Sequence, residues 1–301
     1  MTGISPFLQL IPHPAAERRS VRLLLWRDDL LNPTLPGNKA RKLKYNLLAA
    51  RAQGHSRLLT FGGAYSNHLA AVAAAGRLHG FATIGLVRGE EHQPLNPTLA
   101  RCQDAGMQLH YLDRATYRRR AEPEFLRQLP QQYGPAYLLP EGGTNALALR
   151  GVAELIGELR QHTGFEAVAV AAGTGGTLAG LALGLAEAQY PARAVGVAAL
   201  KGADFLRAEV DALTQAAVGQ VLANYELHTG YHFGGYAKLP AELRAFIGQF
   251  EADFGVLLDP IYTSKLLFGV LDLVERGHFA PGSTVVAVHT GGLQAWAGFG
   301  G

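Results

Sequence analysis

The chain has 301 residues, and 48% of them are apolar, which is enough to bury one large core or two ordinary ones. Its formal charge of +3 is too small and too dispersed to favour a nucleic-acid partner. The single cysteine, Cys102, excludes an internal disulfide framework and a thiolate metal site, and no metal is predicted. With no signal peptide and no apolar stretch long enough for a membrane span, the protein is expected to be soluble and cytoplasmic.

Short apolar runs alternate with longer helical patterns along the chain. Strands are predicted at residues 21–26, 57–61, 82–87, 108–112, 136–139, 167–171, 194–199 and 284–288. Helices are predicted at residues 43–50, 66–79 with Ser66 or Asn67 as the cap, 97–105, 114–132 with an interruption at Pro123, 145–160, 177–188, 240–254 and 264–275. This alternation is typical of α/β proteins with parallel sheets.

Two open parallel-sheet domains are expected, because sixteen elements are predicted along a chain of 301 residues. We place the smaller domain at residues 43–140. It is inserted into a larger domain made of residues 1–42 and 141–301.

The first motif in chain order is GNKARK (residues 37–42), which follows a turn signal containing Pro33 and Pro36. Lys39 therefore lies near a helix N-terminus and between other cations, and both features are expected to lower the pKa of its ammonium group. An amine of that kind forms Schiff bases with carbonyl cofactors. From these six residues alone, a solvated basic turn is the simpler interpretation, and the other motifs change that balance.

A glycine-rich loop follows the predicted strand at residues 167–171. It consists of Gly173, Thr174, Gly175, Gly176 and Thr177. A strand, a glycine loop and a helix in this order aim backbone N–H groups at an anion, and the threonine hydroxyls add donors. Neither a Walker loop nor the glycine spacing of a dinucleotide site is present, so a compact phosphorylated cofactor is favoured. A purely structural turn would need the glycines but not both threonines.

Two other loops have a similar composition. The segment GGAYSNH (residues 62–68) gathers Ser66, Asn67 and His68 at a helix start, which would suit a carboxylate. The segment PEGGTN (residues 140–145) is interpreted mostly as a domain-connecting turn and a helix cap.

Six motifs, taken together and in order, resemble one family. They are GNKARKL, FGGAYSNH, PEGGTN, GTGGT, DPIY (residues 259–262) and VHTGG (residues 288–292). Between about residue 26 and residue 292, the chain resembles pyridoxal-phosphate enzymes of the tryptophan-synthase-β type, which is fold type II. Within that group it is similar to the branch of 1-aminocyclopropane-1-carboxylate deaminases and D-cysteine desulfhydrases.

The resemblance implies that Lys39 carries pyridoxal 5'-phosphate as a Schiff base. Lys42 and the loop of residues 173–177 would hold the phosphate, Asn67 would meet the ring hydroxyl, and Thr290 would contact the cofactor. The candidate catalytic residues are Lys39, Ser66, Tyr236 and Tyr262. The candidate substrate-binding residues are Ser66, Asn67, His68, Tyr262 and Thr263. Without the family match, either tyrosine would be interpreted as a core aromatic residue. A homodimer is also implied by the resemblance alone.

Two positions distinguish activities within the branch. The deaminases carry Glu after the DPxY tyrosine and Leu in the C-terminal motif, whereas this chain has Thr263 and Thr290. A carboxylate beside the pyridine nitrogen would keep a proton there and strengthen the ring as an electron sink, which opening a cyclopropane requires more than expelling a thiolate does. The sequence therefore predicts a lyase that eliminates hydrosulfide from D-cysteine to give pyruvate and ammonia.

Several alternatives remain at this stage. The first is deamination of 1-aminocyclopropane-1-carboxylate to 2-oxobutyrate. Lyases or racemases of serine or of another small amino acid need only a different pocket on the same fold. A protein that binds pyridoxal phosphate without turnover would keep Lys39 and the phosphate loop but would not need Ser66, Asn67 and His68. A phosphate-binding module without a Schiff base would be colourless.

Overall fold

The computed structural model describes residues 6–32, 34–35 and 37–299, so Pro33 and Pro36 of the predicted turn lie outside the described residues. The fold divides into two compact units. The larger unit contains the residues up to Asn38 together with Leu149–Leu293, and the smaller unit contains Lys39–Ala148 and the residues from Gln294 onward. Among the described residues, no helix is both long enough and apolar enough to cross a bilayer.

The unit borders differ from the predicted domain limits at both junctions and at the C-terminal end. The predicted limits were residues 42/43 and 140/141, and the tail was assigned to the larger domain. In the structure the tail groups with the smaller unit. Its 3-10 helix η3 (Leu293–Gly298) contacts the start of α3 (Asn67–His79) in that unit. Gln294 Nε2 donates to Asn67 Oδ1 at 2.7 Å.

The larger unit is built on a six-stranded sheet with the order β1-β2-β10-β7-β8-β9. Its strands are β1 (Leu8–Leu10), β2 (Arg22–Arg27), β7 (Ala167–Ala172), β8 (Arg193–Ala198), β9 (Tyr225–His228) and β10 (Thr284–His289). All neighbours are parallel except β1, which runs antiparallel to β2 at the edge. The prediction of a parallel sheet is confirmed for the other five strands, and β1 was not predicted.

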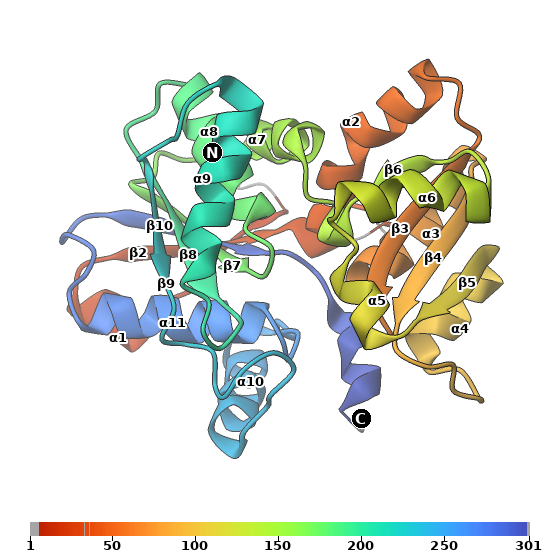
Figure 1. Cartoon of the computed structure of the whole chain (residues 1–301). Helices are drawn as coiled ribbons and strands as arrows, with labels where there is room; N and C mark the ends of the chain where they lie inside the picture. The colour runs from red at the N-terminus through yellow and green to blue at the C-terminus, as the bar shows by residue number, and fades with distance from the viewer. Residues whose placement is uncertain (1–5, 33, 36, 300–301) are drawn as a thin grey trace. The chain divides into compact units, whose positions relative to one another are not determined.

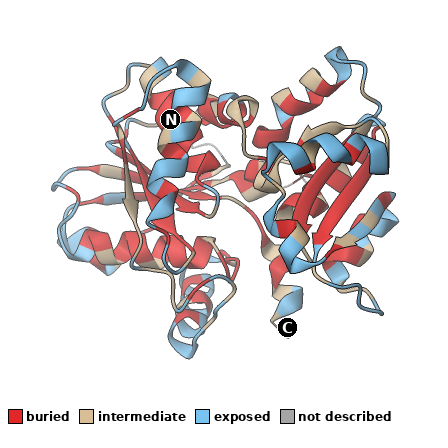
Figure 2. Cartoon of the chain, viewed as in Figure 1, coloured by how far each residue is buried: buried red, intermediate tan, exposed pale blue. Residues whose placement is uncertain are grey.

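Helices cover both faces of this sheet (Figure 1). The helices of the unit are α1 (Pro14–Arg18), α7 (Ala146–Arg160), α8 (Gly176–Glu187), α9 (Phe205–Val218), α10 (Ala241–Phe254) and α11 (Thr263–Glu275). Helix α10 packs on α11. The central strand β7 reads AVAVAA and is buried at every position, as a parallel strand covered on both faces must be (Figure 2). Its side chains join those of α7 and α8 in the main hydrophobic core.

The smaller unit contains a four-stranded, fully parallel sheet with the order β5-β4-β3-β6. Its strands are β3 (Arg57–Gly63), β4 (Ala82–Arg88), β5 (Met107–Leu112) and β6 (Tyr137–Leu139). Its helices are α2 (Asn38–Ala52, which begins one residue before the unit), α3 (Asn67–His79), α4 (Pro97–Asp104), α5 (Arg114–Arg118) and α6 (Pro123–Tyr133). Helices α3 and α4 pack together beside β3, β4 and β5. Helices α5 and α6 contribute to a hydrophobic core with strand residues such as Leu59 and Phe61, through Tyr117, Phe125 and Leu129.

The motif loops follow the carboxyl ends of parallel strands in each sheet taken separately. In the smaller unit, β3 leads into the loop before α3, and β6 leads into the 3-10 turn η2 (Glu141–Gly143). In the larger unit, β7 leads into the glycine loop before α8, and β10 leads into Thr290 and the glycines after it. The carboxyl edge of a parallel sheet is where open α/β folds bind ligands, so the fold places these loops where a site is expected.

Candidate active site

Helix α2 begins at Asn38, so Lys39 and Lys42 lie one turn apart near its N-terminus. The residues just before Lys39 are fixed within the larger unit. Asn38 Nδ2 donates to Thr177 Oγ1 at 2.9 Å, and the Asn38 backbone N–H donates to the Thr290 carbonyl at 3.3 Å. Gly37 has a φ of +78°, and a Cβ there would lie 2.0 Å from the Thr290 carbonyl oxygen. The entry to α2 therefore has no room for a side chain at position 37.

Lys42 is only 2% exposed, and its ammonium group is held by the loop after β6. Nζ donates to the Gly142 carbonyl and to Thr144 Oγ1, both at 3.2 Å. Burial and the neighbouring Lys39 charge place the pKa of Lys42 well below its ordinary value. An ammonium has three N–H donors, so one remains for an anion.

Ser66, Asn67 and His68 form the start of α3, as predicted. Ser66 is the N-cap, and its Oγ accepts from the backbone N–H groups of His68 and Leu69, both at 3.2 Å. Among the described residues, the Ser66 hydroxyl hydrogen has no acceptor and can be donated to a ligand. The same holds for the amide hydrogens of Asn67, whose Oδ1 accepts from Gln294. Gly62 makes this packing possible, because a Cβ there would lie 2.6 Å from Ser66 Oγ.

The His68 ring is buried and is oriented away from the predicted role in carboxylate binding. The Thr60 hydroxyl donates to the Leu139 carbonyl at 2.9 Å, so it accepts from His68 Nε2 at 2.8 Å. Burial, together with the charges of Lys39 and Lys42, lowers the pKa of His68 well below its ordinary value. The neutral ring thus has its one N–H engaged, and its buried Nδ1 is an acceptor without a hydrogen-bond partner among the described residues. As placed, the imidazole has no donor left for a carboxylate.

The loop before α8 has the geometry of an anion cradle. Helix α8 begins after Gly175, which has a φ of +75°, and among the described residues no side chain caps its first turn. A Cβ on Gly175 would lie 2.9 Å from a methyl group of Val210. Thr177 is 7% exposed, and because its Oγ1 accepts from Asn38 Nδ2, its hydroxyl hydrogen can be donated elsewhere. Thr174, by contrast, is exposed.

The two candidate tyrosines are brought together in the larger unit. Their ring centroids are 6.1 Å apart with an interplanar angle of 64°, and Tyr236 is 43% exposed. A Cβ on Gly173 would lie 3.0 Å from the Tyr262 ring, so the start of the glycine loop contacts the same tyrosine. Gly173, Tyr236 and Tyr262, which the sequence suggested separately, are therefore neighbours.

Tyr262 is held by a turn built around the fully buried carboxylate of Asp259. Oδ1 accepts from the backbone N–H groups of Ile261 and Tyr262 at 2.9 and 2.8 Å. Oδ2 accepts from the backbone N–H and the hydroxyl of Thr263 at 2.7 and 2.6 Å. The Thr263 oxygen in turn accepts from the Asp259 N–H at 2.9 Å. The hydroxyl of Thr263 is therefore engaged inside the turn and does not support its predicted direct contact with substrate.

Asp259→Asn is expected to destabilise the protein by about 3 kcal/mol, because an amide NH2 replaces one oxygen that accepts two charge-assisted hydrogen bonds. Urea unfolding monitored by circular dichroism measures the change. The matched control is Asp253→Asn, an exposed carboxylate on α10 that accepts a hydrogen bond from the Gln249 side chain. Equal stability of Asp259→Asn and the control would contradict this account of the turn.

A buried lysine supports the segment that carries Tyr236. Lys265 of α11 is fully buried, and its Nζ donates to the Ala199 carbonyl at 3.1 Å and to the Gly235 carbonyl at 2.7 Å. Burial lowers the pKa of Lys265 to about 8, although the Asp259 charge opposes this shift. The ammonium thus links α11 to the end of β8 and to the residue before Tyr236.

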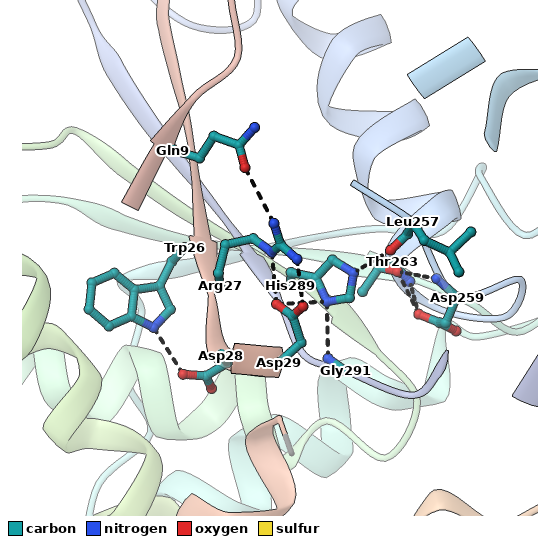
Figure 3. Close-up of polar contacts among 10 residues, drawn as sticks. All are labelled: Gln9, Trp26, Arg27, Asp28, Asp29, Leu257, Asp259, Thr263, His289 and Gly291. Carbon is teal, nitrogen blue, oxygen red and sulfur yellow. Dashed lines mark hydrogen bonds and ion pairs between the residues drawn. The ribbon is translucent and has the colours of Figure 1, made fainter. Parts of the chain in front are cut away.

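A polar network fixes the loop that carries Thr290, as Figure 3 shows. His289 is fully buried, with Nε2 donating to the Leu257 carbonyl at 3.0 Å and Nδ1 accepting from the Gly291 N–H at 3.2 Å. Asp29 lies 3.4 Å from Nδ1 and is held by Arg27 through two bonds of 2.9 and 2.8 Å. His289 also pairs with Arg27 in the parallel register of β10 and β2, so the position of Thr290 is set from both strands.

Comparison with known proteins identifies the family. The model of the family described as "Pyridoxal-phosphate dependent enzyme" matches residues 6–291. The chain belongs to this family. A protein of Pyrococcus horikoshii named as a putative 1-aminocyclopropane-1-carboxylate deaminase is 30% identical over 273 residues, 89% of this chain and 83% of its own length. A D-cysteine desulfhydrase of Yersinia pestis is 31% identical over 287 residues, 89% of this chain and 86% of its own length.

Solved structures agree with this assignment. A crystal structure described as an ACC deaminase homologue has a TM-score of 0.84 at 30% identity and covers 95% of this chain and 89% of its own. O-ureido-L-serine synthase has a TM-score of 0.65 at 14% identity, covering 96% and 89%, which supports the fold alone. The predicted fold class and the predicted cofactor are both confirmed, and this pyridoxal-phosphate enzyme belongs to the group of deaminases and desulfhydrases.

The residues present fit pyridoxal phosphate. The uncapped first turn of α8 and the Gly175 cradle suit its phosphate, since backbone N–H groups at a helix N-terminus bind such anions. Lys39, on the first turn of α2, is half-buried and is the primary amine that the aldehyde requires.

Sequence reasoning missed the residues that support the candidate site residues within each unit. Thr60 bonds to His68, and Thr144 bonds to Lys42. Asp259 holds the segment of Tyr262, and Lys265 holds the segment of Tyr236. Asp259 was visible inside the DPIY motif, but its role as a four-fold acceptor was not. Nothing in the local sequence marks the others.

Proposed function

We propose that the enzyme eliminates hydrosulfide from D-cysteine. The C–S bond at the β-carbon breaks, hydrosulfide leaves with the bonding electron pair, and a proton is removed from the α-carbon. The released 2-aminoacrylate takes up water and gives pyruvate and ammonia. When bound, pyridoxal phosphate supplies a conjugated ring that stabilises negative charge at the α-carbon.

The observation that carries this proposal is the environment of Thr263. Deaminases of the branch carry Glu at this position. In this chain the Thr263 hydroxyl donates to Asp259 Oδ2 and accepts from the Asp259 backbone N–H. An ionised carboxylate at position 263 would lie against the Asp259 carboxylate, and it has no hydrogen to donate to either Asp259 oxygen. Thr290 likewise offers a hydroxyl rather than a charge. The absence of a carboxylate at position 263 therefore favours elimination of hydrosulfide, which needs a weaker electron sink than opening a cyclopropane does.

In the smaller unit, we assign the cofactor attachment and the α-proton transfer to Lys39. Lys42 adds charge and one N–H to phosphate binding while Gly142 and Thr144 hold it in place. Asn67 donates through its amide to the ring oxygen, and Ser66 donates its hydroxyl hydrogen to the substrate carboxylate. The His68 ring positions these two residues through its bond to Thr60, because its own N–H is engaged.

In the larger unit, we assign the phosphate to the loop of residues 173–177, chiefly through the backbone N–H groups of α8 and the Thr177 hydroxyl. Thr290 is assigned to the pyridine nitrogen. Tyr262 and Tyr236 carry hydroxyl groups suited to protonating the departing sulfur. Thr263 acts on the substrate only through the Asp259 turn that orients Tyr262.

We also propose a homodimer and a cytoplasmic location. The dimer is supported only by the family, and the location by the single cysteine, which suits a reducing compartment. Sedimentation of the purified protein tests the first of these.

Turnover of D-cysteine is the test of the proposed function. The cofactor-loaded enzyme is expected to release pyruvate and sulfide from D-cysteine, with a kcat/KM at least about 100-fold above that for 1-aminocyclopropane-1-carboxylate. Pyruvate and 2-oxobutyrate are separated by chromatography, so both reactions are followed in one assay. A preference for the cyclopropane substrate would overturn the proposal in favour of the deaminase. Turnover of neither substrate would direct the search to serine and other small amino acids.

A further inference from the structure

Three side chains with metal-binding atoms converge at the far edge of the six-stranded sheet, on residues that the pyridoxal-phosphate chemistry does not use. Glu226 Oε1 lies 2.7 Å from His278 Nε2 and 3.2 Å from His228 Nε2. The two imidazole rings meet edge to face with their centroids 5.1 Å apart. One ligand atom from each of the three residues lies within 4.8 Å of the other two.

The fold explains this convergence. Glu226 and His228 are two residues apart on β9, so both side chains point to the same face of the sheet. His278 follows the C-terminal end of α11, a helix that packs on β7, β8 and β10. Strand β9 pairs only with β8 and forms the edge of the sheet, as Figure 1 shows. Two elements that are far apart in sequence thus contribute to one cluster.

The cluster is partly open to solvent. The side chains of His228, Glu226 and His278 are 22%, 24% and 33% exposed. Burial raises the pKa of Glu226, but hydrogen bonds and charge from the two histidines outweigh this and lower it to about 2, so the carboxylate is ionised at neutral pH. A bound ion could therefore reach the three ligands from solvent and keep a water molecule as a fourth ligand.

Two imidazole nitrogens and one carboxylate oxygen are a common three-ligand set for Zn²⁺. With metal–ligand bonds of about 2.0–2.1 Å, tetrahedral ligand atoms lie about 3.3 Å apart. The separation of Glu226 from His228, 3.2 Å, already matches, and His278 at 2.7 Å needs to withdraw by about half an ångström. On binding, the ion would replace the protons through which the two Nε2 atoms now bond to Glu226.

We propose that Glu226, His228 and His278 bind one Zn²⁺ ion, with water in the fourth position. The ion would join β9 to the segment after α11 and so stabilise the larger unit. The segment after β9 is already tied to α11 by the hydrogen bond from Tyr231 to Asp272 at 2.6 Å, and it continues to Tyr236. This proposal is independent of the proposed function.

The test is a Zn²⁺ titration of the cofactor-loaded protein, free of any affinity tag, against a chromophoric chelator. One equivalent is expected to bind with a dissociation constant tighter than about 1 μM. Glu226→Gln, His228→Gln and His278→Gln are each expected to weaken binding by at least about 100-fold, more than loss of an outer-shell partner costs. Co²⁺ added in place of Zn²⁺ should show the visible absorption of a four-coordinate site, and Zn²⁺ should raise the thermal midpoint of the wild type but not of the three ligand variants.

The matched control is His92→Gln, an exposed histidine in the smaller unit, which should bind Zn²⁺ like the wild type. Because the variants lie on two separate elements, misfolding of one does not remove the test, and the cofactor absorption band reports folding in each. Zn²⁺ affinity that is unchanged in all three ligand variants would overturn the proposal. So would weak, non-stoichiometric binding by the wild type, which would identify the cluster as a protonated His-Glu-His hydrogen-bond network. Zn²⁺ binding that is lost in both histidine variants but unchanged in Glu226→Gln would also overturn the proposal, because Glu226 would then not be a ligand.

Discussion

Lys39→Ala is expected to lower kcat/KM for D-cysteine by at least about 10⁴-fold, the upper range for loss of a general acid–base group. The reason is that one amine is assigned two tasks, holding the cofactor and moving the α-proton. Lys39 stands on the first turn of α2 directly after Asn38, whose side chain is bonded to Thr177 of the phosphate loop. Pyruvate release measures turnover, and the visible band of the bound cofactor should be lost together with it.

Lys44→Ala is the matched control for this experiment. Lys44 lies on the same helix, is exposed, and packs its Nζ over the Tyr45 ring at 5.3 Å. We expect turnover and cofactor absorption close to those of the wild type. Pyruvate release by Lys39→Ala at a rate comparable with the control would remove Lys39 from the mechanism. Loss of activity in both variants would indicate that the integrity of α2, and not this amine, had been tested.

Gly37→Ala is expected to destabilise the larger unit by about 2–5 kcal/mol. This sums about 1–2 kcal/mol for an L-residue at positive φ and about 1–3 kcal/mol for overpacking. The new methyl group would lie 2.0 Å from the Thr290 carbonyl oxygen and 2.7 Å from its carbon, and both are backbone atoms fixed by the His289 network. Cofactor affinity should fall as well, because Asn38 and Thr290 cannot both keep their places. Urea unfolding and titration with pyridoxal phosphate measure the two effects.

Gly219→Ala separates the two causes. Gly219 is in the same unit with a φ of +75°, but a Cβ there would meet nothing within 4 Å. The control should therefore lose only the contribution from backbone strain, about 1–2 kcal/mol, and bind the cofactor normally. If the two variants showed equal decreases in the free energy of unfolding and in cofactor affinity, the close approach of Gly37 to Thr290 would not affect stability or cofactor binding.

Sequence reasoning located several long, strongly patterned elements within one or two residues, including β7, α8 and α11. It began α2 at residue 43, whereas the helix begins at Asn38 and already contains Lys39. It missed β1 and β9, which are only three and four residues long, and α1, which has five. Both strands alternate polar and apolar residues over too few positions for a periodic signal, whereas β6, also of three residues, is an apolar run. Helix α9 was also missed; its N-cap, Asp204, makes no side-chain cap bond.

The candidate site divides in the same way. Glycine loops and a lysine before a helix are local patterns, so Lys39, Ser66 and the loop of residues 173–177 were visible in the sequence. The contacts that hold them span long stretches of chain. Lys42 reaches Gly142 across 100 residues, and Lys265 reaches Ala199 across 66. The engaged hydroxyl of Thr263 and the orientation of His68 depend on such tertiary contacts, and no composition rule provides them.

The strand order of the larger sheet also sets when that sheet can form during synthesis. Strand β10, near the C-terminal end, lies between β2 and β7, so the two have no direct pairing with each other. All four strands of the smaller unit are complete by Leu139, within one uninterrupted segment. The smaller unit can therefore fold while the ribosome is still translating, whereas the apolar strand β2 keeps one unpaired edge until nearly the whole chain has emerged. Long-range pairing of this kind is slow, and the larger sheet should be the last part of the protein to form.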